Sequence, residues 1–99
     1  MDKIRLTFLE KKALKTALDG FRGRVFVFGS RLDPRQKGGD IDILLQPSRP
    51  ADPYQMRKKV ESRFTRELQQ SLDVVMYDDQ SVFCKEIMKH AQFIDPASF

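Results

Sequence analysis

Cysteine, histidine and tryptophan are nearly missing from this sequence: there is one cysteine, Cys84, one histidine, His90, and no tryptophan. A lone cysteine excludes an intrachain disulfide and a Cys-rich zinc site. No run of about 18 apolar residues occurs, so we expect no transmembrane helix. The beginning of the sequence is charged throughout and lacks the apolar core of a signal peptide. Together these absences predict a cytoplasmic protein with no membrane association.

The length of the chain limits its organisation. A second independently folding unit would need about another 100 residues, so we expect residues 1–99 to form a single domain. The hydrophobic share of 40% and the charged share of 32% are typical of globular proteins. The sequence has no Walker A motif, HExxH motif, nucleophile elbow or dinucleotide fingerprint. The enzyme classes that depend on those motifs are therefore not indicated.

The net charge of +4 is unevenly distributed along the chain. Residues 1–38 contain ten Lys and Arg against four Asp and Glu, whereas residues 39–99 contain eight against ten. A basic N-terminal part suits an anionic partner, such as a nucleotide, a nucleic acid or an acidic protein. The alternative interpretation is an ordinary solvated surface.

The hydrophobic pattern of the N-terminal half predicts one helix and two strands. Thr7 and Glu10 fit a capping box, which predicts a helix over residues 7–19. Residues 24–28 are mostly β-branched and aromatic and are apolar on both faces, as in a central strand that helices cover on at least one side. Residues 40–45 alternate and then become continuously apolar, which predicts a second strand.

The C-terminal half predicts a helix, a strand and a last helix. Asp52 and Pro53 are a typical helix start, and the helix should span about residues 53–70. Its apolar stripe consists of Met56, Val60, Phe64 and Leu68. Residues 72–77 predict the third strand. The last helix begins at Asp79 or Ser81 and ends before Pro96, with an inner face of Phe83, Ile87, Ala91 and Ile94. The expected fold class is α/β (α+β): a small three-stranded mixed sheet with helices packed on it, in the order α-β-β-α-β-α.

Two aspartates stand at the start of the second predicted strand. Residues i and i+2 of a strand share a face about 6.5–7 Å apart, so Asp40 and Asp42 project together while Ile41 enters the core. Two carboxylates this close repel unless a cation lies between them. Mg²⁺ prefers such oxygen ligands and takes others from substrate phosphates. The pair is a candidate magnesium site, and the alternative is two surface acids on an exposed strand face.

A third acid, Asp73, begins the otherwise apolar third predicted strand. If that strand pairs beside the second, Asp73 can join Asp40 and Asp42 as a further metal ligand. Two ions held there would activate an attacking hydroxyl and stabilise a leaving pyrophosphate. The alternative is an ordinary acid at the beginning of a strand.

Gly29 and Ser30 end the first predicted strand and are candidates for binding phosphate. A glycine lets the backbone approach a ligand closely, and a serine hydroxyl can donate to a phosphate oxygen. Arg31, Arg35 and Lys37 place cations in the same loop. The alternative is an ordinary turn followed by a solvated basic loop.

Taken together, these motifs resemble the minimal nucleotidyltransferase (MNT) family of the DNA polymerase β-like nucleotidyltransferase superfamily. The resemblance covers about residues 22–94 and depends on Phe-Gly-Ser-Arg, then Asp-Ile-Asp-Ile-Leu-Leu, then Leu-Asp-Val-Val. It implies Gly29 and Ser30 as the nucleotide-phosphate motif and Asp40 and Asp42 as metal ligands. It implies Asp73 as the third carboxylate, either a metal ligand or the base for the acceptor hydroxyl. The residues between Ser30 and Asp40 depart from the usual family pattern.

The reaction implied by this resemblance is Mg²⁺-dependent transfer of a nucleoside monophosphate, AMP from ATP by family precedent, to a hydroxyl with release of pyrophosphate. The acceptor would be a protein or a nucleic acid, although no nucleic-acid motif is present. The resemblance also implies an alternative: an antitoxin-type binding module that neutralises a helical HEPN ribonuclease with little or no turnover. A third interpretation is a relic site without activity. The sequence does not choose between a homodimer and a complex with a helical partner.

Overall fold

A computed structural model describes residues 4–36 and 39–99 of the chain. The helices are α1 (Phe8–Ala17), α2 (Pro53–Leu68) and α3 (Val82–Met88). The strands are β1 (Gly23–Phe28), β2 (Ile41–Pro47), β3 (Leu72–Met76) and β4 (Gln92–Ile94). Two short 3-10 helices complete the fold, η1 (Gly29–Leu32) and η2 (Pro96–Ser98). Among these described residues, no helix is long and apolar enough to cross a membrane.

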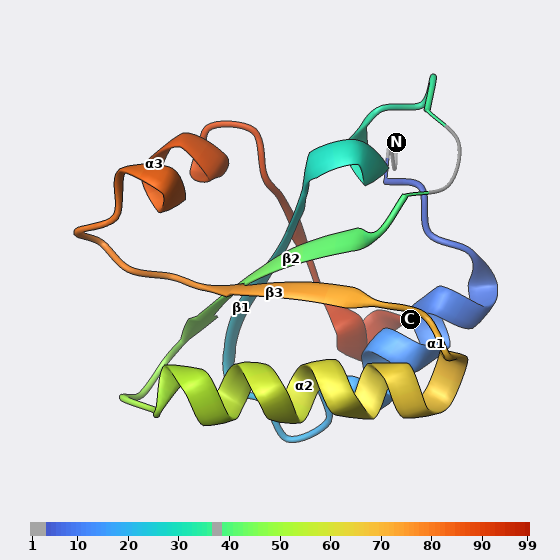
Figure 1. Ribbon diagram of the computed structural model, residues 1–99, viewed down its shortest axis with the longest axis horizontal. Helices are drawn as coiled ribbons and strands as arrows, with labels where there is room; N and C mark the ends of the chain where they lie inside the picture. Colours follow the sequence, from blue (N-terminus) through green and yellow to red (C-terminus); the bar gives the residue numbers. More distant parts are fainter. Residues whose placement is uncertain (1–3, 37–38) are drawn as a thin grey trace.

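The four strands form one mixed sheet in the order β3-β2-β1-β4 (Figure 1). β1 is antiparallel to both β2 and β4, whereas β2 and β3 are parallel. The parallel pair is connected by α2, as a crossover between parallel strands requires. The register places Phe28 opposite Asp42, and Asp42 in turn opposite Asp73. One row of side chains therefore crosses three strands on the same face of the sheet.

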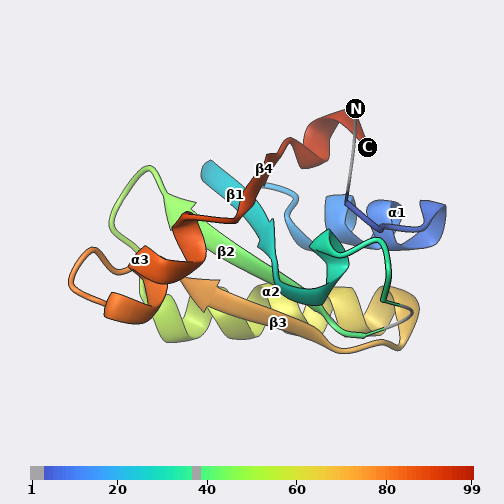
Figure 2. The same ribbon diagram turned by 90° about the horizontal axis from the view of Figure 1, so that it is seen from above.

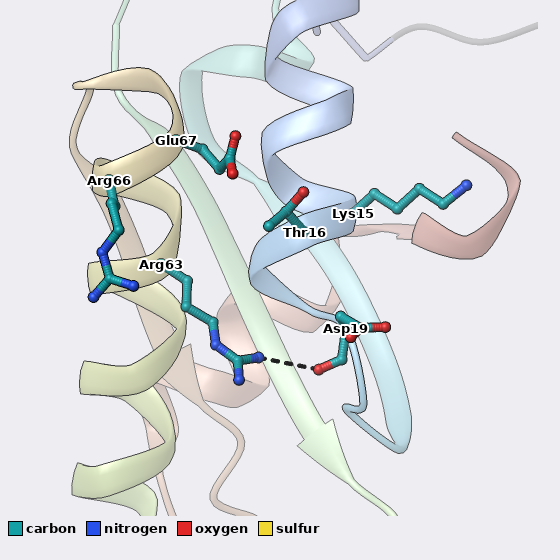
Figure 3. A pocket seen from close by; sticks show the side chains of 6 residues that line it. All are labelled: Lys15, Thr16, Asp19, Arg63, Arg66 and Glu67. Atoms are coloured by element: carbon teal, nitrogen blue, oxygen red, sulfur yellow. Dashed lines mark hydrogen bonds between the residues drawn. The ribbon is translucent and has the colours of Figure 1, made fainter.

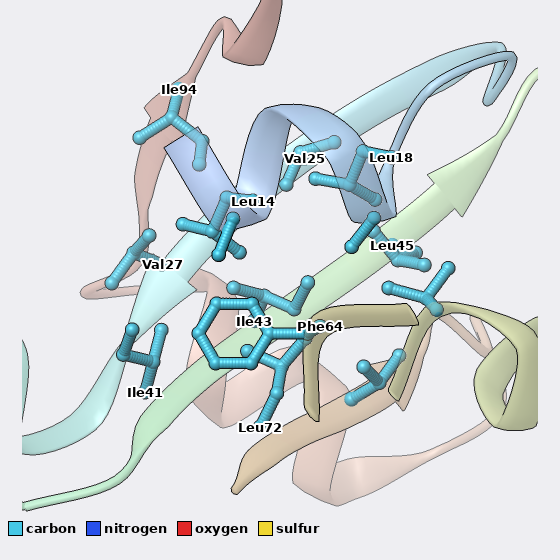
Figure 4. Close-up of a cluster of buried hydrophobic side chains, with 14 residues drawn as sticks. Leu14, Leu18, Val25, Val27, Ile41, Ile43, Leu45, Phe64, Leu72 and Ile94 are labelled. Atoms are coloured by element: carbon cyan, nitrogen blue, oxygen red, sulfur yellow. The ribbon is translucent and has the colours of Figure 1, made fainter. Parts of the chain in front are cut away.

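The main hydrophobic core lies between the sheet and the two longer helices. α1 and α2 lie below the sheet in the view of Figure 1. Figure 4 shows alternate side chains of the strands meeting the helices there, with Phe64 of α2 fully buried among them. Val60 and Phe64 are buried, and Met56 and Leu68 pack at the margins, so the predicted stripe of α2 is confirmed.

The other face of the sheet is covered only in part. α3 packs there through Cys84 and Ile87 against Phe26 and Leu44. Seen from above, α3 stands over the C-terminal ends of β2 and β3, whereas η1 lies near their N-terminal ends (Figure 2). Asp42 and Asp73 occur at those N-terminal ends, next to η1 rather than under α3.

The predicted helix starts are confirmed. Thr7 caps α1 by accepting from the Glu10 amide at 3.1 Å, and the Glu10 carboxylate accepts from the Thr7 amide at 2.9 Å. Asp52 caps α2 by accepting from the amides of Tyr54 and Gln55. These bonds satisfy N–H groups that the first turn of a helix leaves unpaired.

The end of the chain differs from the prediction, because the last helix is shorter and a fourth strand follows it. Ser81 caps α3 as one of the two expected residues, but the helix ends at Met88. Residues 92–94 instead pair with β1, whose outer edge would otherwise expose unpaired backbone groups. Ile94 packs in the α1–α2 core, and Phe83 is 59% exposed rather than on an inner face.

Candidate active site

The predicted acids of β2 and β3 lie side by side. The expected pairing of these strands is confirmed, and Asp42 and Asp73 are direct partners in the register. Alternation along each strand turns both side chains to the face that carries Phe26 and Leu44, away from the α1–α2 core. Asp42 is half-buried and Asp73 is exposed. The sheet therefore presents two carboxyl groups at one spot, one of them open to solvent.

The environment of Asp42 disfavours its charge. Burial raises the pKa of Asp42 to about 6, and the negative charge of Asp73, a hydrogen bond between the two carboxyl groups and the charge of Asp40 act in the same direction. These causes are those of a carboxylate pair without a counter-ion. A cation between the groups would relieve the repulsion, so the electrostatics of the pair fit a metal-binding role.

Asp40 lies one residue before β2, not within it, and its side chain is exposed. Its charge nevertheless reaches Asp42 and also Arg31. In the described part of the chain, no three His, Cys, Asp or Glu side chains are already arranged as a metal cage. Mg²⁺ usually takes one or two carboxylates and completes its shell with water and phosphate oxygens. The Asp42–Asp73 pair with Asp40 nearby fits that donor set.

Gly29 stands against Asp42 where β1 turns into η1. Its φ of +80° is in the left-handed region, and a Cβ at this position would lie 2.5 Å from Asp42 Oδ2. Any larger residue would therefore be strained and would strike the carboxylate. Ser30 follows, and its Oγ would lie 2.7 Å from a Cβ on Gly39. The glycine–serine turn is thus in close contact with both the acid and the backbone that leads to Asp40.

Arg31 differs from the prediction that it faces a bound phosphate. The side chain is buried, and its guanidinium forms an ion pair with both carboxylate oxygens of Glu10 at 2.7 Å. It also donates to the carbonyls of Arg5 and Gly39. A guanidinium has five N–H donors, and these contacts use all of them. Arg31 therefore holds protein groups together and has no donor left for a nucleotide.

Arg35 and Lys37 are the other cations predicted in this loop. Arg35 is exposed and pairs with Asp33 at 3.2 Å. Lys37 was expected to bind nucleotide, and it lies outside the described residues. The role of Lys37 stays a prediction.

Glu10 is the residue of this region that sequence reasoning missed. Glu10 is only 3% exposed, and its carboxylate accepts hydrogen bonds from the Thr7 amide and from the side chains of Arg31 and Gln70. Burial alone would raise its pKa, but hydrogen bonds from Arg31, Gln70 and Thr7 outweigh burial and lower the pKa to about 2. In the sequence, the capping box with Thr7 already accounted for a glutamate at position 10. No local pattern indicated that Glu10 also pairs with Arg31.

The larger surface hollows lie away from the acids. One of about 450 Å³ runs between α1 and α2, where Arg63 donates to the Asp19 carbonyl at 3.1 Å (Figure 3). Its lining carries both signs of charge, from Lys15, Thr16, Asp19, Arg63, Arg66 and Glu67. The candidate site is instead an open surface on the opposite face of the sheet. An open site of this kind needs a ligand or a second protein to exclude water.

Comparison with known proteins identifies the fold. No family model and no curated protein matches the chain. A crystal structure from Shewanella oneidensis superimposes with a TM-score of 0.64 at 15% identity, over 91% of this chain and 72% of that one. A chain from the structure of the tri-AMPylated Shewanella oneidensis HEPN toxin in complex with MNT antitoxin superimposes with a TM-score of 0.57 at 20% identity. The superposition covers 86% of this chain and 68% of that one. A mutant of the toxin–antitoxin pair MntA–HpeT gives 0.63 at 20% identity, over 85% and 70%.

These identities are low, and what the superpositions share is the architecture. Each comparison covers most of this chain and more than two thirds of the other, so the match extends over most of the fold rather than over one motif. The chain therefore shares its fold with chains of the HEPN toxin–MNT antitoxin and MntA–HpeT structures.

Proposed function

We propose that this protein is a Mg²⁺-dependent nucleotidyltransferase that moves AMP from ATP to a hydroxyl of a protein or nucleic-acid acceptor and releases pyrophosphate. The observation that carries the proposal is the placement of Asp42 and Asp73 as register partners, with Asp42 against the Gly29 turn and two residues after Asp40. Two like charges directly opposite one another on adjacent strands destabilise a sheet. Side chains with only a structural role would therefore not need two acids at these positions.

Each residue of the candidate site would have its own role in phosphoryl transfer. Bound Mg²⁺, as one ion or two, would neutralise the triphosphate and stabilise the charge that develops on the leaving pyrophosphate. Asp40 and Asp42 would hold the metal, and Gly29 and Ser30 would admit and orient the phosphates beside them. Asp73 is the exposed member of the pair and would bind metal or accept the proton of the acceptor hydroxyl.

The transfer itself is a single exchange at the α-phosphorus. The acceptor oxygen forms a bond to the α-phosphorus, and the bond from that phosphorus to the bridging oxygen of the β-phosphate breaks. The hydroxyl proton passes to a carboxylate of the site, and pyrophosphate carries away the electron pair of the broken bond. Catalysis of this kind depends mainly on positioning and on charge stabilisation, which a small scaffold with three acids can supply.

A second candidate function is neutralisation of a HEPN ribonuclease by binding, with little turnover. The structurally similar MNT antitoxin occurs in a complex with an AMPylated HEPN toxin, which supports both a helical protein partner and AMP transfer. In this chain, α3 and β4 carry exposed apolar side chains, namely Val82, Phe83 and Phe93, and α3 packs on the same face of the sheet that carries the acids. The two functions are compatible, because a partner docked there would also present an acceptor.

Incubation with radiolabelled ATP and Mg²⁺, with and without the protein encoded by the neighbouring gene, tests the proposal. We expect label on the partner with the wild-type chain, and none with Asp42→Asn or Asp73→Asn. Asp79→Asn is the matched control, since Asp79 is an exposed loop acid outside the site. Partner binding without label would favour the antitoxin function alone. Absence of ATP binding in the presence of Mg²⁺ would exclude the transferase.

A further inference from the structure

Arg31 and Glu10 form a buried ion pair directly behind the candidate site. Arg31 is 6% exposed and Glu10 is 3% exposed. Their side chains meet in a two-point contact, with Nη1 and Nη2 of Arg31 each 2.7 Å from one Glu10 oxygen. Such planar pairing fixes orientation as well as distance, which a lysine could not do.

The remaining donors of Arg31 hold the backbone just before Asp40. Nε and Nη2 both donate to the Gly39 carbonyl, at 3.1 and 2.9 Å. Gly39 has a φ of +85° and is the residue that leads into Asp40. The position of the backbone that leads into Asp40 is therefore set by a side chain of η1 that lies eight residues before Gly39.

The pair also fixes the phosphate-binding turn to the N-terminal segment. Arg31 Nη1 donates to the Arg5 carbonyl at 2.8 Å, and the Arg5 amide donates back to the Arg31 carbonyl at 2.8 Å. The Arg5 guanidinium donates to the carbonyls of Ser30 and Asp33. Glu10 in turn accepts hydrogen bonds from Thr7 and from Gln70, which lies two residues before β3. One network thus touches the segments that carry Ser30, Asp40 and Asp73.

We infer that Arg31, held in place by Glu10, is a positioning residue that orients the Gly39–Asp40 backbone so that Asp40 can share a metal with Asp42. The inference rests on the proposed function, because it assigns Arg31 a role toward the metal and the nucleotide that the site would bind. Arg31 touches neither the nucleotide nor the reacting atoms. Its effect passes through the Gly39 carbonyl.

The test separates positioning from folding by removing both charges at once. Arg31→Met alone leaves Glu10 buried without a counter-charge and is expected to impair folding. The double variant Glu10→Met/Arg31→Met keeps an apolar filling of similar volume, a replacement that is often neutral or stabilising. Arg31→Lys keeps the charge but cannot hold Glu10 and Gly39 together. Lys89→Met is the matched control, since it removes the exposed Lys89–Glu86 pair at the C-terminal end of α3, outside the Arg31 network.

Three measurements follow for each variant. Thermal unfolding reports folding, titration with Mn²⁺ and with the Mg²⁺ complex of a non-transferable ATP analogue reports binding, and hydrogen exchange reports the Asp40 and Ile41 amides. We expect the folded double variant and Arg31→Lys to bind Mn²⁺ and the analogue about tenfold more weakly than wild type. Exchange at residues 40–41 should be faster, and excess Mg²⁺ should restore AMP transfer. Lys89→Met should match wild type in all three.

Wild-type affinity in folded Arg31→Lys and in the double variant would overturn the inference while leaving the proposed function intact. Failure of the wild-type chain to bind either probe would overturn the proposed function, and the inference with it. If the double variant does not fold, Arg31→Lys decides the question by the same titrations.

Discussion

Asp42 is a half-buried acid whose neighbours set the charge that it carries near neutral pH. Its pKa of about 6 lies above the value near 4 of an aspartate in an unfolded chain. A raised pKa in the folded state means that folding is favoured by the protonated form. This favourable contribution is complete below about pH 4 and is lost as the pH rises through about 6.

We therefore expect Asp42→Asn to be more stable than wild type above pH 6, and to abolish AMP transfer. The gain should grow between pH 4 and pH 6 and then stay constant. Partial exposure screens the repulsion, so we expect a gain of about 1 kcal/mol in the free energy of unfolding. Denaturant unfolding at pH 4.5 and pH 8 measures the difference. An Asp42→Asn protein that unfolds, or that keeps wild-type turnover, would make Asp42 a structural residue.

Gly29 contributes to the candidate site through its backbone conformation and through its close contact with Asp42. Gly29→Ala adds a methyl group where Asp42 Oδ2 lies 2.5 Å away, at a φ of +80°. We expect a loss of about 1–3 kcal/mol in the free energy of unfolding and a loss of metal binding, because the Asp42 carboxylate must move. Gly20→Ala is the control, since Gly20 has a similar φ of +83° but nothing within 4 Å of its added Cβ. Equal losses in the two variants would mean that backbone strain alone accounts for the effect.

At the scale of elements, a network of side chains connects α1 to the turn between β1 and β2. Glu10 keeps its charge to a pH of about 2, whereas an unfolded glutamate has a pKa of about 4.5. A lowered pKa means that the ionised form favours folding. Its contribution is complete above about pH 4.5 and is lost as the pH falls toward 2.

We expect Glu10→Gln to lower the free energy of unfolding at pH 7 by about 3–5 kcal/mol, because Arg31 is left buried without a counter-charge. Below pH 4.5 the wild type should lose stability and approach the variant. Unfolding curves at pH 7, 4.5 and 3 provide the comparison. A difference that does not shrink at pH 3 would show that the glutamate acts through packing and not through charge.

The sequence predicted some elements well and others poorly, for identifiable reasons. Helix caps and period-two alternation are local signals, so the start of α1 at Thr7 and the inward side chain of Ile41 next to the outward one of Asp42 followed from the chain alone. The pairing of Asp42 with Asp73 depends on which strands become neighbours, so the sequence left it as a condition. β4 is three residues long and has no local signal, and its formation depends on the free edge of β1. The role of Arg31 depends on Glu10, which lies two elements away.

Substitutions in the C-terminal strand β4 test the burial that the structure gives to its side chains. Ile94 is 7% exposed and lies in the α1–α2 core, whereas its neighbour Phe93 is 61% exposed and stacks edge-on against Phe26. We expect Ile94→Ala to lower the free energy of unfolding by about 2–4 kcal/mol and Phe93→Ala by about 1 kcal/mol. The reverse order would contradict the burial that the strand gives to these two side chains.

For the molecule as a whole, the two faces of the sheet differ in how completely they are covered. α1 and α2 close one face, and α3 covers only part of the other, with Val82 74% exposed and Phe83 59% exposed. Exposed apolar groups beside a candidate site are typical of a protein–protein interface. We predict that the working protein is a homodimer or a complex with a helical partner.

Light scattering of the pure protein and co-purification with the product of the neighbouring gene measure the assembly. Phe83→Ser should weaken it, and Tyr54→Ser is the control because Tyr54 is 61% exposed on α2, on the covered side of the sheet. A monodisperse monomer with no co-purifying protein and efficient transfer to a small hydroxyl compound would refute the prediction.

Ligand binding should be visible in the stability of the whole chain. We expect Mg²⁺ with ATP to raise the melting temperature more than either alone, by about 10 °C or more at 100 times Kd. The acids need a cation before they can accept a triphosphate. Calorimetry in EDTA is the control, and full-affinity ATP binding there would contradict the proposed site.

The parallel pairing of β2 with β3 also has a consequence for the order of folding. Asp42 and Asp73 stand on either side of the whole of α2, so they meet only when the crossover is complete. Contacts so far apart along the chain form late, because the loop between them must first be closed. A divalent ion that requires both carboxylates would therefore bind the finished sheet and not the β1–β2 hairpin. Adding the ion during refolding should slow unfolding and leave the folding rate nearly unchanged.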